Sequence, residues 1–360
     1  MNLPTEPIGS LPRTPELLAG LAEIEAGRRI EADIEPLFDA AVADTMARFA
    51  ATGSPVVTDG EQRKYQNFFT YSLTGAANIA PDGFEIPFKA GHIRRLPRLT
   101  FAPFRYRLYA SDHLARARRH TTLPVKQAVI APSALSLVYP EDGIDGYTRD
   151  AFISDLLDEH QKDIAGCLAG GAENVQIDFT EGRFALKVDS TGALLDGFVD
   201  LINLVVRRFP ADDRRRLGIH TCAGSDRDSS HSQDVDYADF LPALFEVDVA
   251  NFYVAMAREA DRRPALALIG KLMRPGQRVF VGVVDPTDPR IETPEEVCAR
   301  ILEAAEHIPP NRLGTTDDCG FAPFSDDTTT SRDTAFAKIA ARVAGTKLAE
   351  KELGARLLKP

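Results

Sequence analysis

Short runs of β-branched and apolar residues recur along the whole chain, and this repetition is the feature that most limits its fold. Each run ends in a polar or glycine-containing cluster, and a segment with helical periodicity usually follows it. Eight runs are recognisable: TEPIG near residue 5, PVVTDGE from 55, PVKQAVIAP from 124, NVQID from 174, RLGIHT from 216, VANFYVA from 249, RVFVGVVD from 278 and RLGTTDD from 312. Strands that alternate with helices form parallel βαβ units, and eight in succession predict an α/β fold of the closed (β/α)8, or TIM barrel, type.

The helices expected between these runs have clear boundary signals. The segment 147–171 has apolar residues at helical spacing and ends in Gly-Gly, and a second helix should begin at Thr293 as N-cap, followed by Pro294 and by Glu296 for a capping box. The connection between the second and third strands is much longer than the others. We expect residues 62–122 to form an insertion with a β-hairpin around the Asp82-Gly83 turn signal, plus a helix. Without repeats or low-complexity linkers, residues 1–360 are expected to form a single domain.

Composition excludes several classes of protein. Hydrophobic residues make up 44% of the chain and charged residues 26%, and no apolar run approaches the roughly 20 residues that span a bilayer. The first residues lack the basic and apolar stretches of a secretory signal, so a cytoplasmic location is expected. The net charge of -11 argues against a broad nucleic-acid interface, and the local basic runs RARRH and RRFPADDRRR are interpreted as solvated helix faces.

Polar residues follow the ends of most of the expected strands. In a (β/α)8 barrel these ends meet on one face, which carries the active site. The residues concerned are Gly9, Ser10, Asp59, Glu61, Asp178, His220, Cys222, Asp285, Asp317, Asp318 and Cys319. Taken singly, a strand-end aspartate is typically a helix cap and a buried cysteine a small hydrophobe. Their coincidence at successive strand ends predicts an active site.

Within this set, His220, Cys222 and Cys319 offer one nitrogen and two sulfur ligands. The chain has only 4 cysteines, too few and too scattered for a disulfide framework. Zinc takes such ligands tetrahedrally, and three protein ligands leave one position for a substrate, as in catalytic sites. The sequence therefore predicts a catalytic Zn²⁺ site. The other two cysteines, Cys167 and Cys298, fall within helical patterns and are expected to be buried free thiols.

Six motifs, in this order, carry a family resemblance: IGSLPRTPEL, VVTDGEQRK, NVQID, IHTC, GVVDPTDPRIETPEEVCARIL and RLGTTDDCGF. They resemble the catalytic domain of cobalamin-independent methionine synthase, in the short form with a single barrel, from Ile8 to about Phe321. The family fold is the (β/α)8 barrel of the uroporphyrinogen decarboxylase and methionine synthase superfamily. The resemblance implies an enzyme that transfers a methyl group from a 5-methyltetrahydropteroyl donor to homocysteine, held on zinc as a thiolate.

The resemblance also implies roles for individual residues. The zinc ligands would be His220, Cys222 and Cys319. The residues that hold the amino and carboxyl groups of a homocysteine-like acceptor would be Ser10, Glu61 and Asp178. These roles suit the residue types, because carboxylates bind ammonium groups and hydroxyl donors bind carboxylates.

The chain departs from the family pattern at two positions. In NFYVAMARE, Ala255 or a neighbour stands where the family has a glutamate zinc ligand, and Glu259 lies a few residues further on. In VDPTDPR, Thr287 stands where the family has a histidine that assists methyl release. A hydroxyl cannot replace an imidazole as an acid near neutral pH. Asp285, or a metal-coordinated water, is left as the group that could transfer a proton.

Two other functions stay open at this stage. The acceptor could be another small thiol such as coenzyme M, with an epoxide or a methylated carrier as alkyl donor. A sulfonate acceptor would require arginines at the mouth of the barrel, and Arg13, Arg63 and Arg183 follow strand-end motifs. The chain could also be a metal-free, decarboxylase-like or ligand-binding barrel in which His220 and the cysteines are merely buried. Metal content separates the last hypothesis from the others, and acceptor specificity separates the first two.

Overall fold

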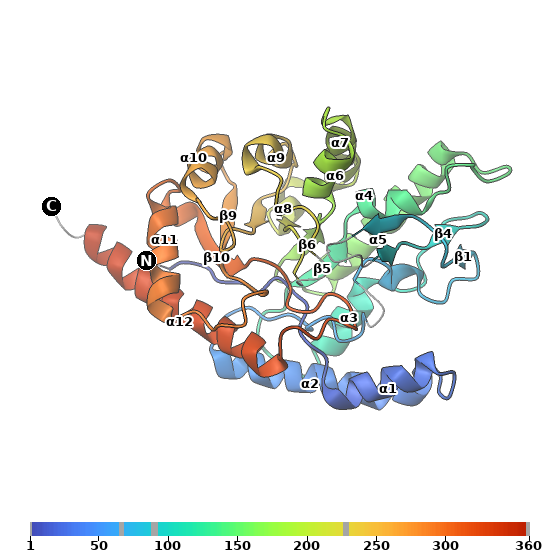
Figure 1. The fold of residues 1–360 in the computed structure, drawn as a ribbon, viewed down its shortest axis with the longest axis horizontal. Coiled ribbons are helices and arrows are strands. Elements are labelled where there is room, and N and C mark those ends of the chain that lie inside the picture. The colour runs from blue at the N-terminus through green and yellow to red at the C-terminus, as the bar shows by residue number, and fades with distance from the viewer. Residues whose placement is uncertain (1, 65–67, 88–92, 226–229, 358–360) are drawn as a thin grey trace.

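A parallel sheet forms the centre of the computed structural model, which describes residues 2–64, 68–87, 93–225 and 230–357 (Figure 1). The sheet has six strands in the order β10-β9-β8-β7-β6-β5. They are β5 (Gln127–Ile130), β6 (Val175–Asp178), β7 (Leu217–Thr221), β8 (Asn251–Val254), β9 (Arg278–Val284) and β10 (Leu313–Asp317). Apart from Arg278 at the start of β9, every residue of these strands is buried, as parallel strands covered on both faces require.

The two strands predicted nearest the N-terminus are present only as single bridges at the two edges of this sheet. Thr5 pairs in parallel with Thr315 of β10, and Val57 pairs in parallel with Val125, next to β5. The two edge segments contact each other, because the Thr58 hydroxyl donates a hydrogen bond of 2.9 Å to the carbonyl of Gly9. Among the described residues the hydrogen-bonded ladder therefore has six strands, and the closure into eight strands that we predicted is not seen as continuous strand pairing.

Proline explains why these two segments do not extend the ladder. Pro4 and Pro7 lie on either side of Thr5, and Pro55 lies two residues before Val57. A proline has no backbone N–H to donate and its φ is fixed, so Pro4 and Pro7 limit pairing on both sides of Thr5, and Pro55 limits it before Val57. The runs of β-branched residues identify the right segments, but the prolines within them shorten the strands.

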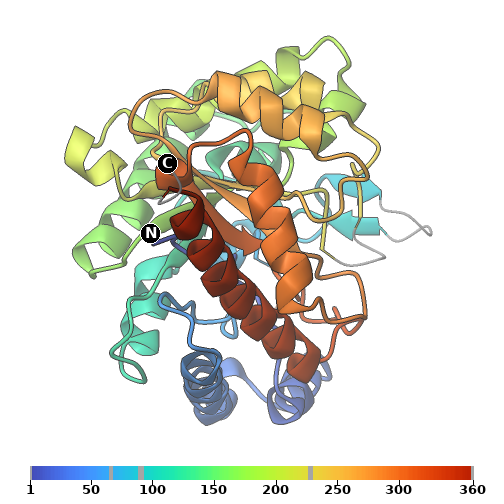
Figure 2. The same cartoon turned by 90° about the vertical axis from the view of Figure 1, so that its left-hand side faces the viewer.

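Helices alternate with the strands of the sheet and cover it. They are α1 (Pro15–Glu25), α2 (Glu35–Thr52), α3 (Ala110–Ala117), α4 (Pro132–Leu135), α5 (Arg149–Ala169), α6 (Gly182–Val188), α7 (Ala193–Val206), α8 (Ala211–Arg214), α9 (Tyr237–Leu244), α10 (Arg263–Leu272), α11 (Pro294–Ala305) and α12 (Arg332–Leu357). The long C-terminal helix α12 packs against α11, α2 and β10, and Figure 2 shows it alongside α11. No helix in the described part of the chain has the length and apolar character needed to cross a membrane.

The predicted start of α11 is confirmed. The Thr293 side chain accepts a hydrogen bond of 3.2 Å from the backbone N–H of Glu296, and the Glu296 carboxylate accepts one of 2.7 Å from the N–H of Thr293. This reciprocal pair is a capping box, and it satisfies two N–H groups that the first turn leaves free.

Residues 62–122 contain two small antiparallel sheets and α3. The strands are β1 (Ile79–Ala80), β2 (Glu85–Pro87), β3 (Ile93–Arg95) and β4 (Arg98–Leu99), with β1 paired to β4 and β2 paired to β3. Asp82 and Gly83 connect β1 to β2, which do not pair with each other, so the hairpin predicted at that turn is wrong. Asp82 instead forms an ion pair of 3.0 Å with Arg98. The residues that join β2 to β3, 88–92, lie outside the described part of the chain.

Candidate active site

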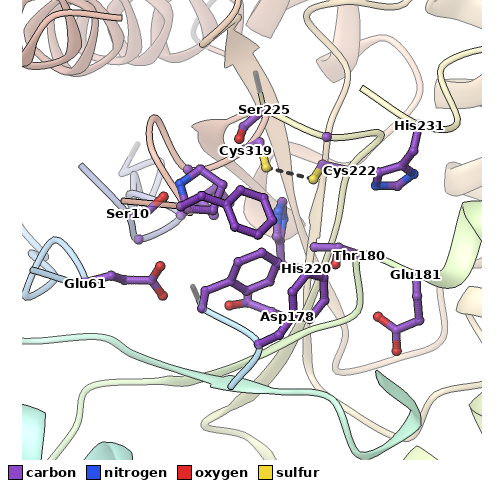
Figure 3. Close-up of a pocket in the computed structure, with 18 of the residues that line it drawn as sticks. Ser10, Glu61, Asp178, Thr180, Glu181, His220, Cys222, Ser225, His231 and Cys319 are labelled. Atoms are coloured by element: carbon purple, nitrogen blue, oxygen red, sulfur yellow. Dashed lines mark hydrogen bonds between the residues drawn. The ribbon is translucent and has the colours of Figure 1, made fainter. Parts of the chain in front are cut away.

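One cavity lies at the carboxyl ends of the central strands (Figure 3). Most of the residues that we predicted for the site line it: Ser10, Glu61, Asp178, His220, Cys222 and Cys319. They come from five different segments, and the sheet brings them together because parallel strands end on the same side. Asp285, at the end of β9, does not line the cavity.

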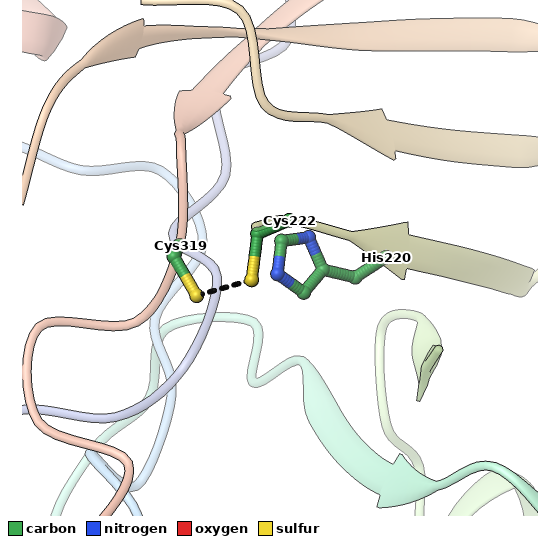
Figure 4. A group of neighbouring side chains, drawn as sticks. All are labelled: His220, Cys222 and Cys319. Atoms are coloured by element: carbon green, nitrogen blue, oxygen red, sulfur yellow. Dashed lines mark hydrogen bonds between the residues drawn. The ribbon is translucent and has the colours of Figure 1, made fainter. Parts of the chain in front are cut away.

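His220, Cys222 and Cys319 form a compact cluster in this cavity (Figure 4). Their candidate ligand atoms lie within 4.8 Å of one another, and the two sulfur atoms are 2.7 Å apart. His220 is the last residue but one of β7, Cys222 directly follows that strand, and Cys319 follows β10. Nδ1 of His220 lies 3.3 Å from the carbonyl oxygen of Tyr253. A nitrogen that faces a carbonyl must carry the proton, so the tautomer leaves the Nε2 lone pair free toward the sulfurs.

The two thiols of this cluster have different acidities. The hydrogen bond with Cys319 lowers the pKa of the Cys222 thiol well below its usual range, and the neighbouring His220 acts in the same direction. Burial raises the pKa of the Cys319 thiol, and proximity to Cys222 raises it further. Cys222 is therefore the first of the pair to become a thiolate, the form in which cysteine binds metals.

An apolar side chain lies beside the two thiols of the cluster. Ala255, at the end of β8, packs directly against Cys222 and Cys319. Glu259, four residues later, is engaged elsewhere, because its carboxylate accepts hydrogen bonds of 3.1 Å each from Arg183 and from the side-chain amide of Gln233. Within the described ranges, the cluster therefore offers three protein ligands.

Glu61 has the only positive φ, 54°, among the non-glycine residues that the structure describes. Its N–H donates a hydrogen bond of 3.0 Å to the Asp59 carboxylate, and its own carboxylate forms an ion pair of 2.8 Å with the buried Lys64. A left-handed conformation costs a residue such as glutamate of the order of 1 to 3 kcal/mol, and such strain concentrates at functional sites. The local turn thus holds a buried carboxylate at the cavity wall.

Ser10 and Asp178 lie near Glu61 on the same side of the cavity. The Ser10 hydroxyl accepts a hydrogen bond of 3.3 Å from the N–H of Ala322. Its position depends on Gly320, because a Cβ atom there would lie only 2.0 Å from the Ser10 hydroxyl oxygen. Burial raises the pKa of Asp178 to about 6, and the nearby Glu61 carboxylate adds to the effect. The three residues provide two carboxylates and a hydroxyl for a polar ligand.

The Asp285 carboxylate is hydrogen-bonded within its own loop. Its carboxylate accepts hydrogen bonds of 2.8 Å from both the N–H and the hydroxyl of Thr287. The neighbouring Asp318 accepts hydrogen bonds of 2.7, 2.7 and 2.9 Å from three successive N–H groups that follow β8. Only a glycine at 282 permits this arrangement, because a Cβ atom there would lie 1.9 Å from the Asp318 carboxylate. These two aspartates hold the loops beside the cluster of His220, Cys222 and Cys319.

The three arginines considered for a sulfonate acceptor do not line the cavity. Arg13 donates hydrogen bonds to backbone carbonyls, including one of 3.0 Å to the carbonyl of Phe324. Arg63 forms a two-fold ion pair with Glu35, with distances of 2.9 and 2.8 Å. Arg183 is paired with Glu259, as described above. All three guanidinium groups are thus committed to structural contacts.

Several cavity residues were not predicted from the sequence. They are Phe68, Phe69, Ile86, Gln176, Thr180, Glu181, Phe184, Ser225, His231 and Phe324. The apolar members form an aromatic cover in which the ring centroids of Phe68 and Phe324 are 5.7 Å apart. Burial raises the pKa of Glu181 to about 7, although the Ser133 hydroxyl donates a hydrogen bond of 2.5 Å to it. The alternation of NVQID could have identified Gln176, whereas no sequence pattern singles out the aromatic residues of the insertion.

The fold and the site define this chain as an α/β protein with a candidate metal centre at the carboxyl ends of a parallel sheet. It belongs to the family described as cobalamin-independent synthase, catalytic domain, which matches residues 3–342. It is 25% identical over 355 residues to the methionine synthase of Saccharolobus solfataricus, covering 98% of this chain and 96% of that protein.

A second relative and a solved structure agree with this assignment. The 5-methyltetrahydropteroyltriglutamate–homocysteine methyltransferase of Streptomyces griseus is 26% identical over 340 residues, covering 88% of this chain and 39% of that longer protein. The structure of a B12-independent methionine synthase from Shewanella sp. W3-18-1, in complex with selenomethionine, superposes with a TM-score of 0.75 at 18% identity, over 99% of this chain and 100% of that one. At this identity the superposition shows that the fold is shared.

Proposed function

We propose that this protein is a zinc-dependent methyltransferase that methylates the thiol of homocysteine. The observation that carries the proposal is the convergence of His220, Cys222 and Cys319 in one buried cavity that also contains Ser10, Glu61 and Asp178. The names of the family and of the relatives support the same reaction.

The chemistry of the donor set fits zinc. One imidazole and two thiols suit this borderline-soft ion, and Nε2 of His220 is buried with no hydrogen-bond partner among the described residues. Nδ1 of the same ring is held by a backbone carbonyl, as the second nitrogen of a metal-binding histidine usually is. Zinc bound by these three residues would supply a Lewis acid that keeps a substrate thiol deprotonated at neutral pH.

The remaining polar residues suit an amino-acid thiol. Glu61 and Asp178 present carboxylates to the cavity and would bind the ammonium group, while the Ser10 hydroxyl would donate to the carboxylate. Aromatic side chains line the cavity, among them Phe68, Phe69 and Phe324, and would limit the access of water to the reacting groups. Proximity would then supply much of the rate acceleration, provided that the thiol and the methyl carbon are held in line.

The methyl donor in this proposal is a 5-methyltetrahydropteroyl compound, as the name of the Streptomyces griseus relative states for that protein. Release of methyl from an amine nitrogen leaves an anion that must be protonated. Because Asp285 is held by Thr287 outside the cavity lining, Glu181 is the better candidate for this acid, with a pKa of about 7. The coenzyme M alternative lacks support, since Arg13, Arg63 and Arg183 are committed elsewhere.

We also propose that residues 1–360 form one domain of the (β/α)8 type, with residues 62–122 as an insertion. The contacts between the two edge segments support this arrangement: Thr58 donates to the carbonyl of Gly9, and Leu11 donates a backbone hydrogen bond of 3.0 Å to Gly60. These hydrogen bonds join the segments at the two edges of the six-stranded sheet, where a closed barrel would have strand pairing.

Elemental analysis combined with a thiol-methylation assay tests the proposal. We expect one zinc per chain, and loss of that zinc in the double variant Cys222→Ser/Cys319→Ser. The matched control is Cys167→Ser/Cys298→Ser, which removes the other two cysteines and should retain zinc. Turnover of homocysteine with 5-methyltetrahydrofolate, and none of coenzyme M with epoxides, is the expected specificity. Zinc retained by the first double variant contradicts the metal assignment, and a protein purified without metal would favour a metal-free ligand-binding role.

A further inference from the structure

A chain of buried polar side chains leads from the cavity into the interior of the sheet. Gln176 and Asp178 are two residues apart on β6, so their side chains lie on the same face of the strand. Nε2 of Gln176 donates a hydrogen bond of 2.7 Å to Oδ1 of Asp178. On its other side, Oε1 of Gln176 accepts a hydrogen bond of 2.7 Å from the ammonium group of Lys126. Both Lys126 and Gln176 have 0% exposure, so water does not compete for these bonds.

Lys126 is itself fixed from the far side of this chain. Its ammonium nitrogen lies 3.8 Å from a carboxylate oxygen of Glu6 and 3.9 Å from the centre of the Tyr253 ring. The Tyr253 hydroxyl donates a hydrogen bond of 2.6 Å to the same Glu6 oxygen, and the side-chain amide of Asn174 donates one of 2.8 Å to the other oxygen. The lysine is therefore held between an anion, an aromatic face and Gln176.

The Lys126 ammonium group fixes the direction of both hydrogen bonds that the Gln176 side chain makes. An ammonium group has three donors and no acceptor, so only the oxygen of the Gln176 amide can face it. The NH₂ group of that amide must then face Asp178, and the usual ambiguity between the two ends of a glutamine does not arise. Asp178 accepts this bond, and no other described residue donates a hydrogen bond to its side chain. Its remaining acceptor capacity is available to a ligand in the cavity.

We propose that Gln176, oriented by Lys126, is a positioning residue that turns the Asp178 carboxylate toward the ammonium group of an α-amino thiol. This inference rests on the acceptor that we propose for the site. With this positioning role, the acceptor must carry an amino group as well as a thiol. Thiols of the same length without an amino group should bind to the metal but gain nothing from the Lys126–Gln176–Asp178 chain.

Calorimetric binding of two thiols to the purified metalloprotein tests this inference. The probes are L-homocysteine and 4-sulfanylbutanoate, which is homocysteine without its amino group. The first variant is Gln176→Met, which keeps the length of the side chain and removes both hydrogen bonds. The second is Lys126→Met, which retains the glutamine but releases its amide from a fixed direction. The matched control is Gln127→Met, the same substitution at a buried position of the adjacent strand β5.

We expect the unaltered protein to bind homocysteine more tightly than its analogue. Gln176→Met should weaken homocysteine binding about tenfold and change binding of the analogue less than about twofold, because one charge-assisted interaction is lost. Lys126→Met should show a smaller loss of the same selectivity, and Gln127→Met none. If Gln176→Met does not fold, the double variant Lys126→Met/Gln176→Met leaves no unpaired lysine and carries the same expectation.

The outcomes distinguish failure of the proposed acceptor, homocysteine, from failure of the positioning role of Gln176. Failure of the unaltered protein to bind homocysteine overturns the proposed acceptor and this inference with it. Tight homocysteine binding with unchanged selectivity in the Gln176 and Lys126 variants overturns the positioning role alone. An equal loss for both thiols also overturns it, because that result reports a general distortion of the cavity.

Discussion

Replacement of Glu181 by glutamine should change the pH dependence of stability in a defined direction. Burial raises the pKa of this carboxyl from 4.5 to about 7 in the folded protein. Between these two pH values the unfolded chain has released the proton and the folded chain still holds it. The folded state therefore binds more protons there, and the free energy of unfolding falls as pH rises through this window.

The size of the effect follows from the same two values. At about 1.4 kcal/mol per pH unit, the difference between 4.5 and about 7 corresponds to about 3 kcal/mol. A glutamine at 181 is uncharged at every pH and can still accept the hydrogen bond of the Ser133 hydroxyl. Glu181→Gln should thus match the unaltered protein below about pH 4.5 and be more stable by up to about 3 kcal/mol above pH 8.

Urea unfolding between pH 4.5 and 8.5 measures this difference. Glu246→Gln, the same substitution at a side chain that is 74% exposed, is the matched control. If the profile of Glu181→Gln ran parallel to that of the unaltered protein, the reasoning would be refuted. That result would mean that Glu181 has its ordinary pKa in the folded protein.

Three further substitutions test other parts of the structure. Ala255→Glu places a carboxylate beside the thiols of Cys222 and Cys319, so release of the proposed zinc to a chelator should slow at least about tenfold; an unchanged release rate would show that position 255 does not face the proposed metal site. Arg94 contacts Asp326 at 2.8 Å and lies 4.1 Å from the centre of the Phe324 ring that covers the cavity. Arg94→Ala should therefore speed alkylation of the cavity cysteines in the metal-free protein several-fold, and a rate equal to that of the unaltered protein would argue against this role. Lys338→Met removes the buried ammonium group that lies 2.8 Å from the Glu292 carboxylate, which keeps Arg300 at 3.6 Å, and should lower the free energy of unfolding by about 1 to 3 kcal/mol in urea titrations; a loss below about 0.5 kcal/mol would indicate that the pair is dispensable.

Local patterns in the sequence determined the alternation of helices with the six strands of the sheet and the polar residues that follow those strands. Burial of both faces makes a parallel strand a continuous apolar run, and this run can be recognised without knowledge of its neighbours. The pair His220 and Cys222 was recognisable for the same reason, since both lie at the end of one such run. The capping box at Thr293 is equally local, because its partners are three residues apart.

Tertiary structure decided which distant groups meet. Cys319 is 97 residues from Cys222, and only the packing of β7 and β10 into one sheet brings their sulfur atoms to 2.7 Å. The same packing pairs Glu259 with Arg183 and leaves Ala255 beside Cys222 and Cys319. Hydrogen-bond directions across the sheet, such as those from Lys126, depend on side chains from several strands. A sequence pattern describes which residues face inward, whereas the partner that each finds there depends on the register and crossing of all the strands together.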